Sequence, residues 1–245
     1  MSAATAPWMA GCKMGTMSHP RWLRVSQETP PLFGKTKFLE AQIDEFLDKV
    51  AEGSIYFENG LLVLIDQGLT AACEEKLQQV LGLQERCNEL RRSVVSTLYT
   101  EMLIPDFRGN VLSLLSNLYG LLRVLTKSFQ EFMIEHATTS ISAEDKVEIE
   151  ALIGFVVKSI QSTIIASRAF FRNPPAVRDH IYEIRVFSAE AGKVALRLKT
   201  RIFSSAMPLE RMMHARDSID IIAAISEMAE EISDDLSIYA IKRIL

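Results

Sequence analysis

The chain has 245 residues, and its 27 Lys and Arg residues nearly balance 31 Asp and Glu residues, giving a formal net charge of -4. This balance excludes the strongly basic surface with which proteins coat nucleic acids, so we expect no nucleic-acid partner. Hydrophobic residues make up 48% of the chain. Because this exceeds what a solvated monomeric bundle needs, we expect some apolar surface to contact a partner, and a homodimer is the simplest expectation.

The cysteines and the N-terminal residues indicate the compartment. Cys12, Cys73 and Cys87 lack the Cys-x-x-Cys spacing of a thiolate metal site or redox pair. Residues 1–33 are rich in Met, Pro, Gly, Ser and Thr without any period, which predicts a disordered leader. This leader lacks the apolar core of a secretory signal, and the longest uncharged stretch, Gly109–Leu122, is shorter than the roughly 20 residues that cross a bilayer. We therefore predict a cytoplasmic protein without a transmembrane helix.

Apolar residues recur at helical spacing through the first half of the chain. They predict one helix over about residues 39–64, a second over about 77–98, and a third that begins near Pro105 and continues to Phe132. Proline fits the first turn of a helix, because it lacks only an amide hydrogen that is unpaired there. Gly53 and Gly60 interrupt the first pattern only weakly.

The second half shows the same order of elements. Ser142, with Asp145 three residues later, predicts the N-cap of a fourth helix, which ends before the pair Pro174 and Pro175. Apolar residues over 181–202 predict a fifth helix, and Pro208 opens a sixth. No strand-like alternation competes with these patterns.

These elements predict an all-α fold. Residues 34–245 form a helical domain of six long helices in two pseudo-repeated three-helix bundles, with half repeats at about 34–138 and 139–245. Helices of about 30 residues would be about 45 Å long. We therefore expect an elongated helical bundle.

Carboxylates gather on the predicted sixth helix. At helical spacing, Glu227, Glu231 and Asp234 lie opposite the apolar stripe, and Glu230 lies one turn before Asp234. Like charges one turn apart cost about 0.2–0.5 kcal/mol per pair unless a cation or a basic neighbour neutralises them. The cluster is either a solvated acidic face or a metal-binding one. The predicted fifth helix offers basic neighbours instead of a metal: Arg185, Lys193, Arg197, Lys199 and Arg201.

The predicted second helix carries a weaker version of this pattern. Glu85 and Glu89 lie opposite its apolar stripe, but Arg86, Arg91 and Arg92 flank them. Ordinary ion pairs explain these carboxylates at least as well as a metal does.

Signatures of catalysis are missing from the sequence. None of the four histidines has a glutamate three residues before it, as a di-iron carboxylate bundle requires. There is no glycine-rich phosphate loop, no His-Glu-x-x-His and no recognised nucleophile motif. We therefore predict that the chain is not an enzyme.

Short motifs occur in a fixed order along this helical chain. They are Leu32–Lys35, Glu85-x-x-x-Glu89-x-x-Arg92, Pro105–Arg108 and Ile225–Glu230. In this order they resemble the PhoU-like family, and more closely its branch of phosphate transport regulators that accompany PiT-type phosphate transporters. The likeness covers about residues 32–245.

The resemblance implies acidic pairs on adjacent helices that assemble surface clusters of iron, zinc or another metal. It makes Glu85, Glu89, and Glu227 with Glu230 or Glu231 candidate metal ligands, and the acidic face of the predicted sixth helix adds Asp234. The expected partner carboxylates are absent, because their positions fall on Tyr119 and Arg123 and near Ser188 and Gly192. Two carboxylates on one helix rarely hold a transition metal without other ligands. We therefore expect no constitutive cofactor, while a divalent metal or iron at the residual pairs stays open.

The resemblance also implies a function, which is that of a non-enzymatic regulator or accessory protein of inorganic phosphate transport. Its partner would be a PiT-type phosphate transporter or a phosphate signalling protein, and it would meet the membrane only through that transporter. Two alternatives remain, namely a carboxylate-bridged metal-binding helical protein and a structural adaptor unrelated to phosphate.

Overall fold

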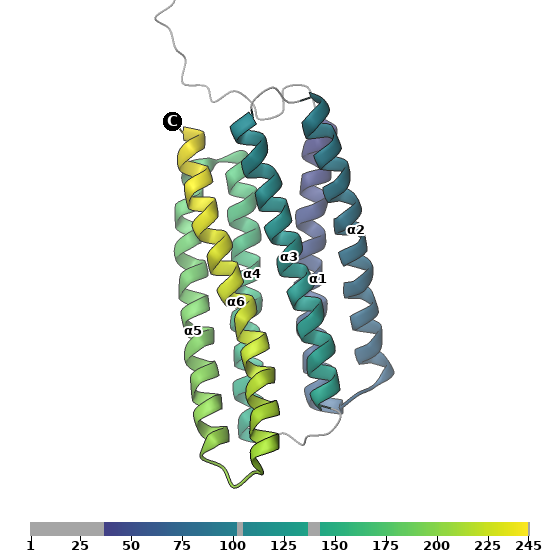
Figure 1. The fold of residues 1–245 in the computed structure, drawn as a ribbon, viewed down its shortest axis with the longest axis vertical. Coiled ribbons are helices and arrows are strands. Elements are labelled where there is room, and N and C mark those ends of the chain that lie inside the picture. Colours follow the sequence, from purple (N-terminus) through teal and green to yellow (C-terminus); the bar gives the residue numbers. More distant parts are fainter. Residues whose placement is uncertain (1–36, 102–104, 137–142, 245) are drawn as a thin grey trace, which may run out of the picture. The chain divides into compact units, whose positions relative to one another are not determined.

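The computed structural model describes residues 37–101, 105–136 and 143–244. Six long helices and one short 3-10 turn account for nearly all of them (Figure 1). They are α1 (Lys37–Gln67), α2 (Ala71–Glu101), α3 (Pro105–His136), α4 (Ala143–Arg172), η1 (Pro174–Ala176), α5 (Val177–Phe203) and α6 (Leu209–Ile244). The predicted leader, residues 1–33, and the predicted cap Ser142 lie outside the described residues.

The helices form two bundles of three. Helices α1, α2 and α3 pack on one another, and α4, α5 and α6 do the same. The bundles meet where α3 packs on α6 and α1 packs on α4 (Figure 1). The described residues contain no strand, so the predicted all-α fold is confirmed.

The predicted apolar stripes form the interior. Phe46, Phe57, Leu118, Phe129 and Phe170 are among the side chains without solvent exposure. Three apolar residues within the predicted helices, Leu77, Leu112 and Phe187, are only half-buried. The stripes therefore identify the core correctly and overestimate its width at the edges of the helices.

Proline marks the helix boundaries as predicted. Pro105 is the first residue of α3, and Pro174 is buried in the turn between α4 and α5. Pro208 precedes α6, where its carbonyl accepts the Met212 amide at 3.1 Å. At the end of α1, Gly68 adopts a φ of 74° and its amide donates to the Leu64 carbonyl at 2.9 Å. Because this left-handed conformation favours glycine, Gly68 ends α1 without strain.

Gly60 allows α1 and α3 to approach closely. A Cβ atom placed on Gly60 would lie 2.2 Å from Cζ of Phe129. The Phe129 ring also meets Phe57 edge-on, with centroids 6.0 Å apart. Because Gly60 has no side chain, the Phe129 ring of α3 can pack directly against the α1 backbone.

Polar side chains help to join the two bundles along α1 and α4. Gln161 donates to the hydroxyl of Ser54 at 2.6 Å and to the carbonyl of Ala51 at 3.2 Å. Arg168 and Arg172 both bind Asp44, the latter at 2.7 Å. The contact between bundles is thus specific as well as apolar.

Among the described residues, helix α4 alone is both long enough and apolar enough to be considered as a membrane span. By length and composition alone its residues 144–172 could cross a membrane, but 61% of that apolar window is buried against the other helices. Burial of this extent is typical of a core helix in a bundle. The hydropathy of α4 is therefore explained by its place between α1, α5 and α6.

Candidate functional site

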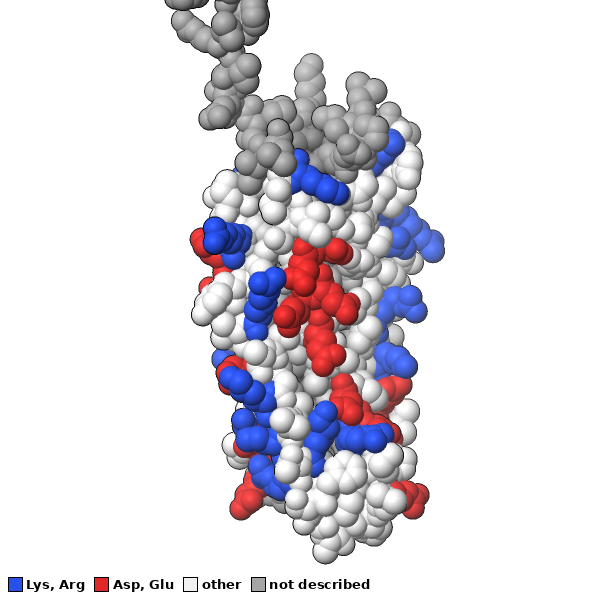
Figure 2. All heavy atoms as spheres, turned by 60° about the vertical axis from the view of Figure 1, so that its left-hand side comes forward, with Lys and Arg blue, Asp and Glu red and all other residues white. Residues whose placement is uncertain are grey.

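Helix α6 presents its carboxylates to solvent. Glu227, Glu231 and Asp234 are exposed, and Glu230 and Asp235 are half-buried beside them. We call these residues the α6 carboxylate cluster. Figure 2 shows acidic side chains gathered in one patch on the face formed by α5 and α6. The predicted geometry of this helix face is confirmed.

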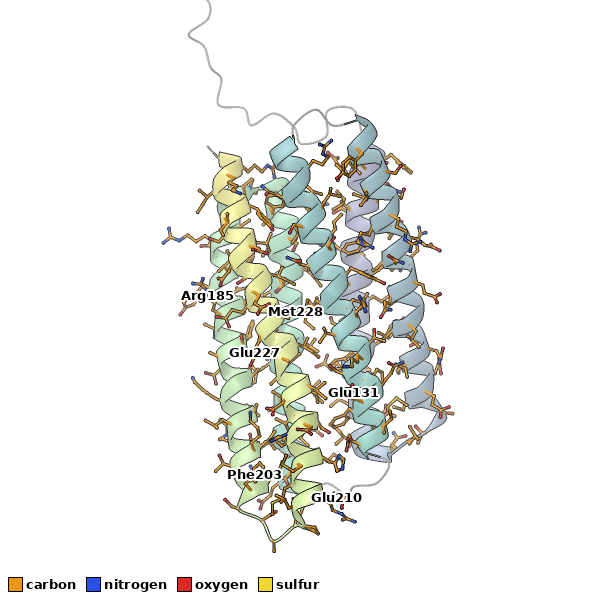
Figure 3. The ribbon with its side chains drawn as sticks, viewed as in Figure 1. Glu131, Arg185, Phe203, Glu210, Glu227 and Met228 are labelled. Atoms are coloured by element: carbon orange, nitrogen blue, oxygen red, sulfur yellow. The ribbon has the colours of Figure 1, made fainter. Side chains whose placement is uncertain are left out.

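In the part of the chain that the structure describes, an ion pair neutralises the cluster at one end. Arg185 on α5 donates to Asp234 at 2.7 Å, and this hydrogen bond raises the pKa of the arginine. Asn117 on α3 donates to Asp235 at 2.9 Å. Within the described residues, Glu227, Glu230 and Glu231 form no ion pair. Figure 3 shows that Arg185 lies nearer the C-terminal end of α6 than Glu227 does.

Most basic residues of α5 point to other partners. Arg197 binds Glu148 on α4 at 2.9 Å, and Arg201 binds Asp145 on α4 at 3.2 Å. Lys193 binds Glu190 on its own helix at 2.6 Å. Within the described ranges, Arg185 and Lys199 are the basic residues of α5 that form ion pairs with α6, and Lys199 binds Asp220, two turns before the cluster. The predicted neutralisation by α5 is therefore partial.

The α2 carboxylates lie in a different environment. Glu89 accepts a hydrogen bond from Arg86 at 3.1 Å, and the same guanidinium binds Glu45 on α1 at 2.8 Å. Glu85 and Glu89 are both exposed. Helix α2 packs on α1 and α3, whereas α6 packs on α3, α4 and α5. The structure does not bring the two sets of candidate ligands together.

The positions expected to complete a metal site hold other chemistry. Arg91 on α2 stacks on the ring of Tyr119, with its guanidinium carbon 5.1 Å from the ring centroid. Ser188 is buried, and Gly192 has no side chain. Among the described residues no three or more His, Cys, Asp or Glu side chains are arranged to hold a metal ion. The donor set does not fit a transition-metal cluster, so we derive no chemistry from one.

A shallow hollow at one end of α1 and α4 was not predicted from the sequence. It is lined by Glu40, Ile43, Asp44, Phe171 and Arg172. Asp44 neutralises Arg172 there. A phosphate site needs cations that are free to bind an anion, so this hollow is a poor site for phosphate. The pairing joins residues 128 positions apart, and no local sequence signal could reveal it.

These observations single out one surface of the described residues as a candidate for partner binding. The α6 carboxylate cluster is acidic, exposed at Glu227, Glu231 and Asp234, and largely without ion pairs among the described residues. Such a surface attracts basic partners through solvent. We take the cluster as the candidate functional site.

Comparisons with known proteins identify the fold of the chain. No protein-family model matches it, and no curated protein sequence matches it significantly. A PhoU-like protein from Shewanella oneidensis has a similar structure, with a TM-score of 0.72 at 14% identity over 82% of this chain and 99% of that one. A second protein of that organism, named as a PhoU-like phosphate regulatory protein, gives 0.70 at 13% identity over 82% and 98%. PhoU from Pseudomonas aeruginosa gives 0.61 at 14% identity over 84% and 96%.

Proposed function

We propose that this chain, which has the fold of PhoU-like proteins, is a non-enzymatic regulator of inorganic phosphate transport. Its partner is a PiT-type phosphate transporter or a phosphate signalling protein, and the contact is made in the cytoplasm. The motif order along residues 32–245 supports this proposal, as does the structural similarity to a phosphate regulatory protein over 82% of the chain. The observation that carries it is the exposed α6 carboxylate cluster.

The charge of the cluster suits the cytoplasmic face of a transporter. Cytoplasmic loops of membrane proteins carry an excess of Lys and Arg. An unneutralised acidic helix face complements such loops without any insertion of the chain into the bilayer. Exposed charges are screened beyond about 10 Å at 0.1 M ionic strength, so the contact is reversible and weakens as salt is added.

Charge reversal tests the role of the cluster. The variant Glu227→Lys/Glu231→Lys should keep its helicity, because both side chains are exposed, and should no longer co-purify with the transporter. A matched control is Glu75→Lys/Glu85→Lys, which makes the same change in net charge on the exposed face of α2 and should bind normally. Equal loss in both variants would indicate a general charge effect instead of a site.

Deletion of the gene tests the link to phosphate. We expect phosphate uptake to change at low or high external phosphate, and the wild-type gene to restore it while the double reversal does not. Unchanged uptake at every phosphate level would contradict the regulatory function and favour the alternative of a structural adaptor unrelated to phosphate. A neighbouring gene for a phosphate permease would support the transporter as partner.

A further inference from the structure

Three arginines on α2 and α3 lack a carboxylate partner. Arg92 and Arg123 are exposed, and Arg91 is half-buried. Among the described residues none of the three takes part in an ion pair. The arginines of α4 and α5 that lie near one another do bind carboxylates: Arg168, Arg172, Arg197 and Arg201. Arginines without carboxylate partners are what an anion site requires.

The packing of Arg91 holds its guanidinium in place and leaves donors free. The guanidinium carbon lies 5.1 Å from the centroid of the Tyr119 ring on α3, and Nη2 donates to Oδ1 of Asn88 at 3.0 Å. Its Nε is buried and has no hydrogen-bond partner in the described part of the chain. A guanidinium stacked on an aromatic ring keeps N–H groups at its edge for an anion. Arg91 is therefore an oriented donor whose hydrogen bonds are only partly made.

The backbone brings Arg123 to the same place. Arg123 follows Tyr119 by one turn on α3, and Asn88 precedes Arg91 by about one turn on α2. Because the two helices run in opposite directions (Figure 1), both steps lead the same way along the bundle. Side chains one turn apart on a helix surface are neighbours. Arg123 therefore lies beside Tyr119, about level with Asn88, while Arg92 directly follows Arg91. We call Arg91, Arg92, Tyr119 and Arg123 the arginine corner.

The charges around the arginine corner leave it positive. On α2, Glu89 is bound by Arg86, and Glu85 lies two turns before the second arginine of the corner. On α3, one turn beyond the corner, Lys127 binds Glu131 at 3.3 Å. Figure 1 shows α3 between α2 and α6, so the α6 carboxylate cluster lies across α3 from the two arginines of α2. Glu85 and Glu89 are therefore the nearest carboxylates on α2, and they lie opposite three arginines.

We propose that the arginine corner binds a phosphate dianion, either free or as the terminal group of a phosphate ester. The planar fork of a guanidinium matches two oxygens of a phosphate group, and arginine is the usual residue for such bidentate binding. Guanidiniums that come from two helices approach from different sides, which suits a tetrahedral group better than a planar carboxylate. The site lies outside the α6 carboxylate cluster and involves no transporter, so it does not depend on the proposed function.

Calorimetric titration of the full chain with inorganic phosphate tests the free ligand. Chloride keeps the ionic strength constant, and we expect saturable binding of phosphate above that background. Arg123→Gln should weaken binding about 10-fold, and Arg91→Gln/Arg123→Gln about 100-fold, because each variant removes charged hydrogen bonds to the ligand. Arg123→Lys keeps the charge but loses the fork, so its affinity should lie between those of Arg123→Gln and the wild type.

A matched control removes two other arginines. Arg178 on α5 and Arg211 on α6 are both exposed and lie away from the arginine corner. Arg178→Gln/Arg211→Gln makes the same change in net charge and should bind phosphate as the wild type does. Circular dichroism checks that all variants fold. If loss of the stacked Arg91 disturbs folding, the exposed Arg123 alone still tests the site.

Vesicles test phosphate that is carried by a lipid. Phosphatidylcholine vesicles with and without phosphatidic acid, whose head group is a phosphate monoester, serve as the probe in cosedimentation. Binding of inorganic phosphate or of the phosphatidic acid vesicles, if lost in Arg91→Gln/Arg123→Gln, supports the site and identifies the source of its ligand. Three results would overturn the proposal: neither probe binds, binding persists unchanged in that double variant, or the control variant loses binding equally.

Discussion

The carboxylates of the two bundles differ in their charged neighbours. On α2 of the first bundle arginines lie next to the carboxylates, whereas on α6 of the second bundle most carboxylates have other carboxylates as neighbours. Arg86 binds Glu89 and Glu45, but Glu227 and Glu231 have no ion pair among the described residues. The packing around glycine differs as well. In the first bundle the Phe129 ring packs against Gly60, whereas in the second no atom lies within 4 Å of a Cβ placed on Gly154. The first bundle thus pairs Glu89 of α2 and fills the space at Gly60, whereas the second leaves Glu227 and Glu231 of α6 without ion pairs among the described residues and Gly154 without a close neighbour.

The largest effect on the free energy of unfolding should come from a substitution at Gly60, where the Phe129 ring packs in the first bundle. Gly60→Ala places a methyl group where Cζ of Phe129 lies 2.2 Å away. Overpacking of this kind costs about 1–3 kcal/mol. Urea denaturation should show the lower free energy of unfolding. An unchanged midpoint would mean that the Phe129 ring moves freely, and that the first bundle is not tightly packed there.

The corresponding substitution in the second bundle should have the opposite sign. Gly154→Ala adds a methyl group to the interior of α4 where no atom lies within 4 Å. Alanine stabilises a helix interior by about 0.5–1 kcal/mol relative to glycine. Thermal unfolding should show a higher midpoint. A lower midpoint would reveal a contact at Gly154 that the isolated chain does not make.

The same change of charge on α2 and on α6 should change the free energy of unfolding in opposite directions. Both changes should be smaller than those of the glycine substitutions. Glu89→Lys loses the ion pair with Arg86 and should destabilise the chain by about 0.5 kcal/mol. Glu231→Lys removes a repulsion and places a lysine one turn after Glu227, so it should stabilise by a similar amount. Both effects should shrink in high salt. The same sign for both variants would contradict the electrostatic difference between the two faces.

The smallest effect should be that of metal removal. The carboxylates that the family resemblance leads us to expect fall on Tyr119 and Arg123 and near Ser188 and Gly192. Dialysis against a chelator should therefore leave the unfolding midpoint unchanged. Elemental analysis provides the direct measurement. Stoichiometric iron or zinc that survives dialysis and is lost in Glu231→Ala would show a metal centre on α6.

Sequence patterns were enough to predict where the long helices lie and which face of each helix is buried. The positions of Pro105, Pro174 and Pro208 and the apolar repeats identified every described helix, because both signals are local. The exposure of Glu227 and Glu231 followed from the same repeat. Contacts between distant helices could not be predicted, since Arg91 on Tyr119 and Arg172 on Asp44 depend on how the helices are arranged in space.

The exposed side of α5 shows another limit of pattern analysis. It carries the apolar residues Tyr182, Leu196 and Phe203, which are fewer than the buried ones, and Lys193 and Thr200 lie between them. A repeat shows that a helix face is apolar, but only the packed structure shows which of two such faces is already covered.

The contacts between bundles join equivalent helices, α1 with α4 and α3 with α6. Two copies of one subunit meet in this way across a twofold axis. In a true pair of identical subunits every substitution appears on both sides at once. Here the two halves belong to one chain, so each can change alone. That independence allows α6 to keep mutually repelling carboxylates while α3 carries Tyr119 and Arg123. A single chain can therefore present two surfaces with different chemistry.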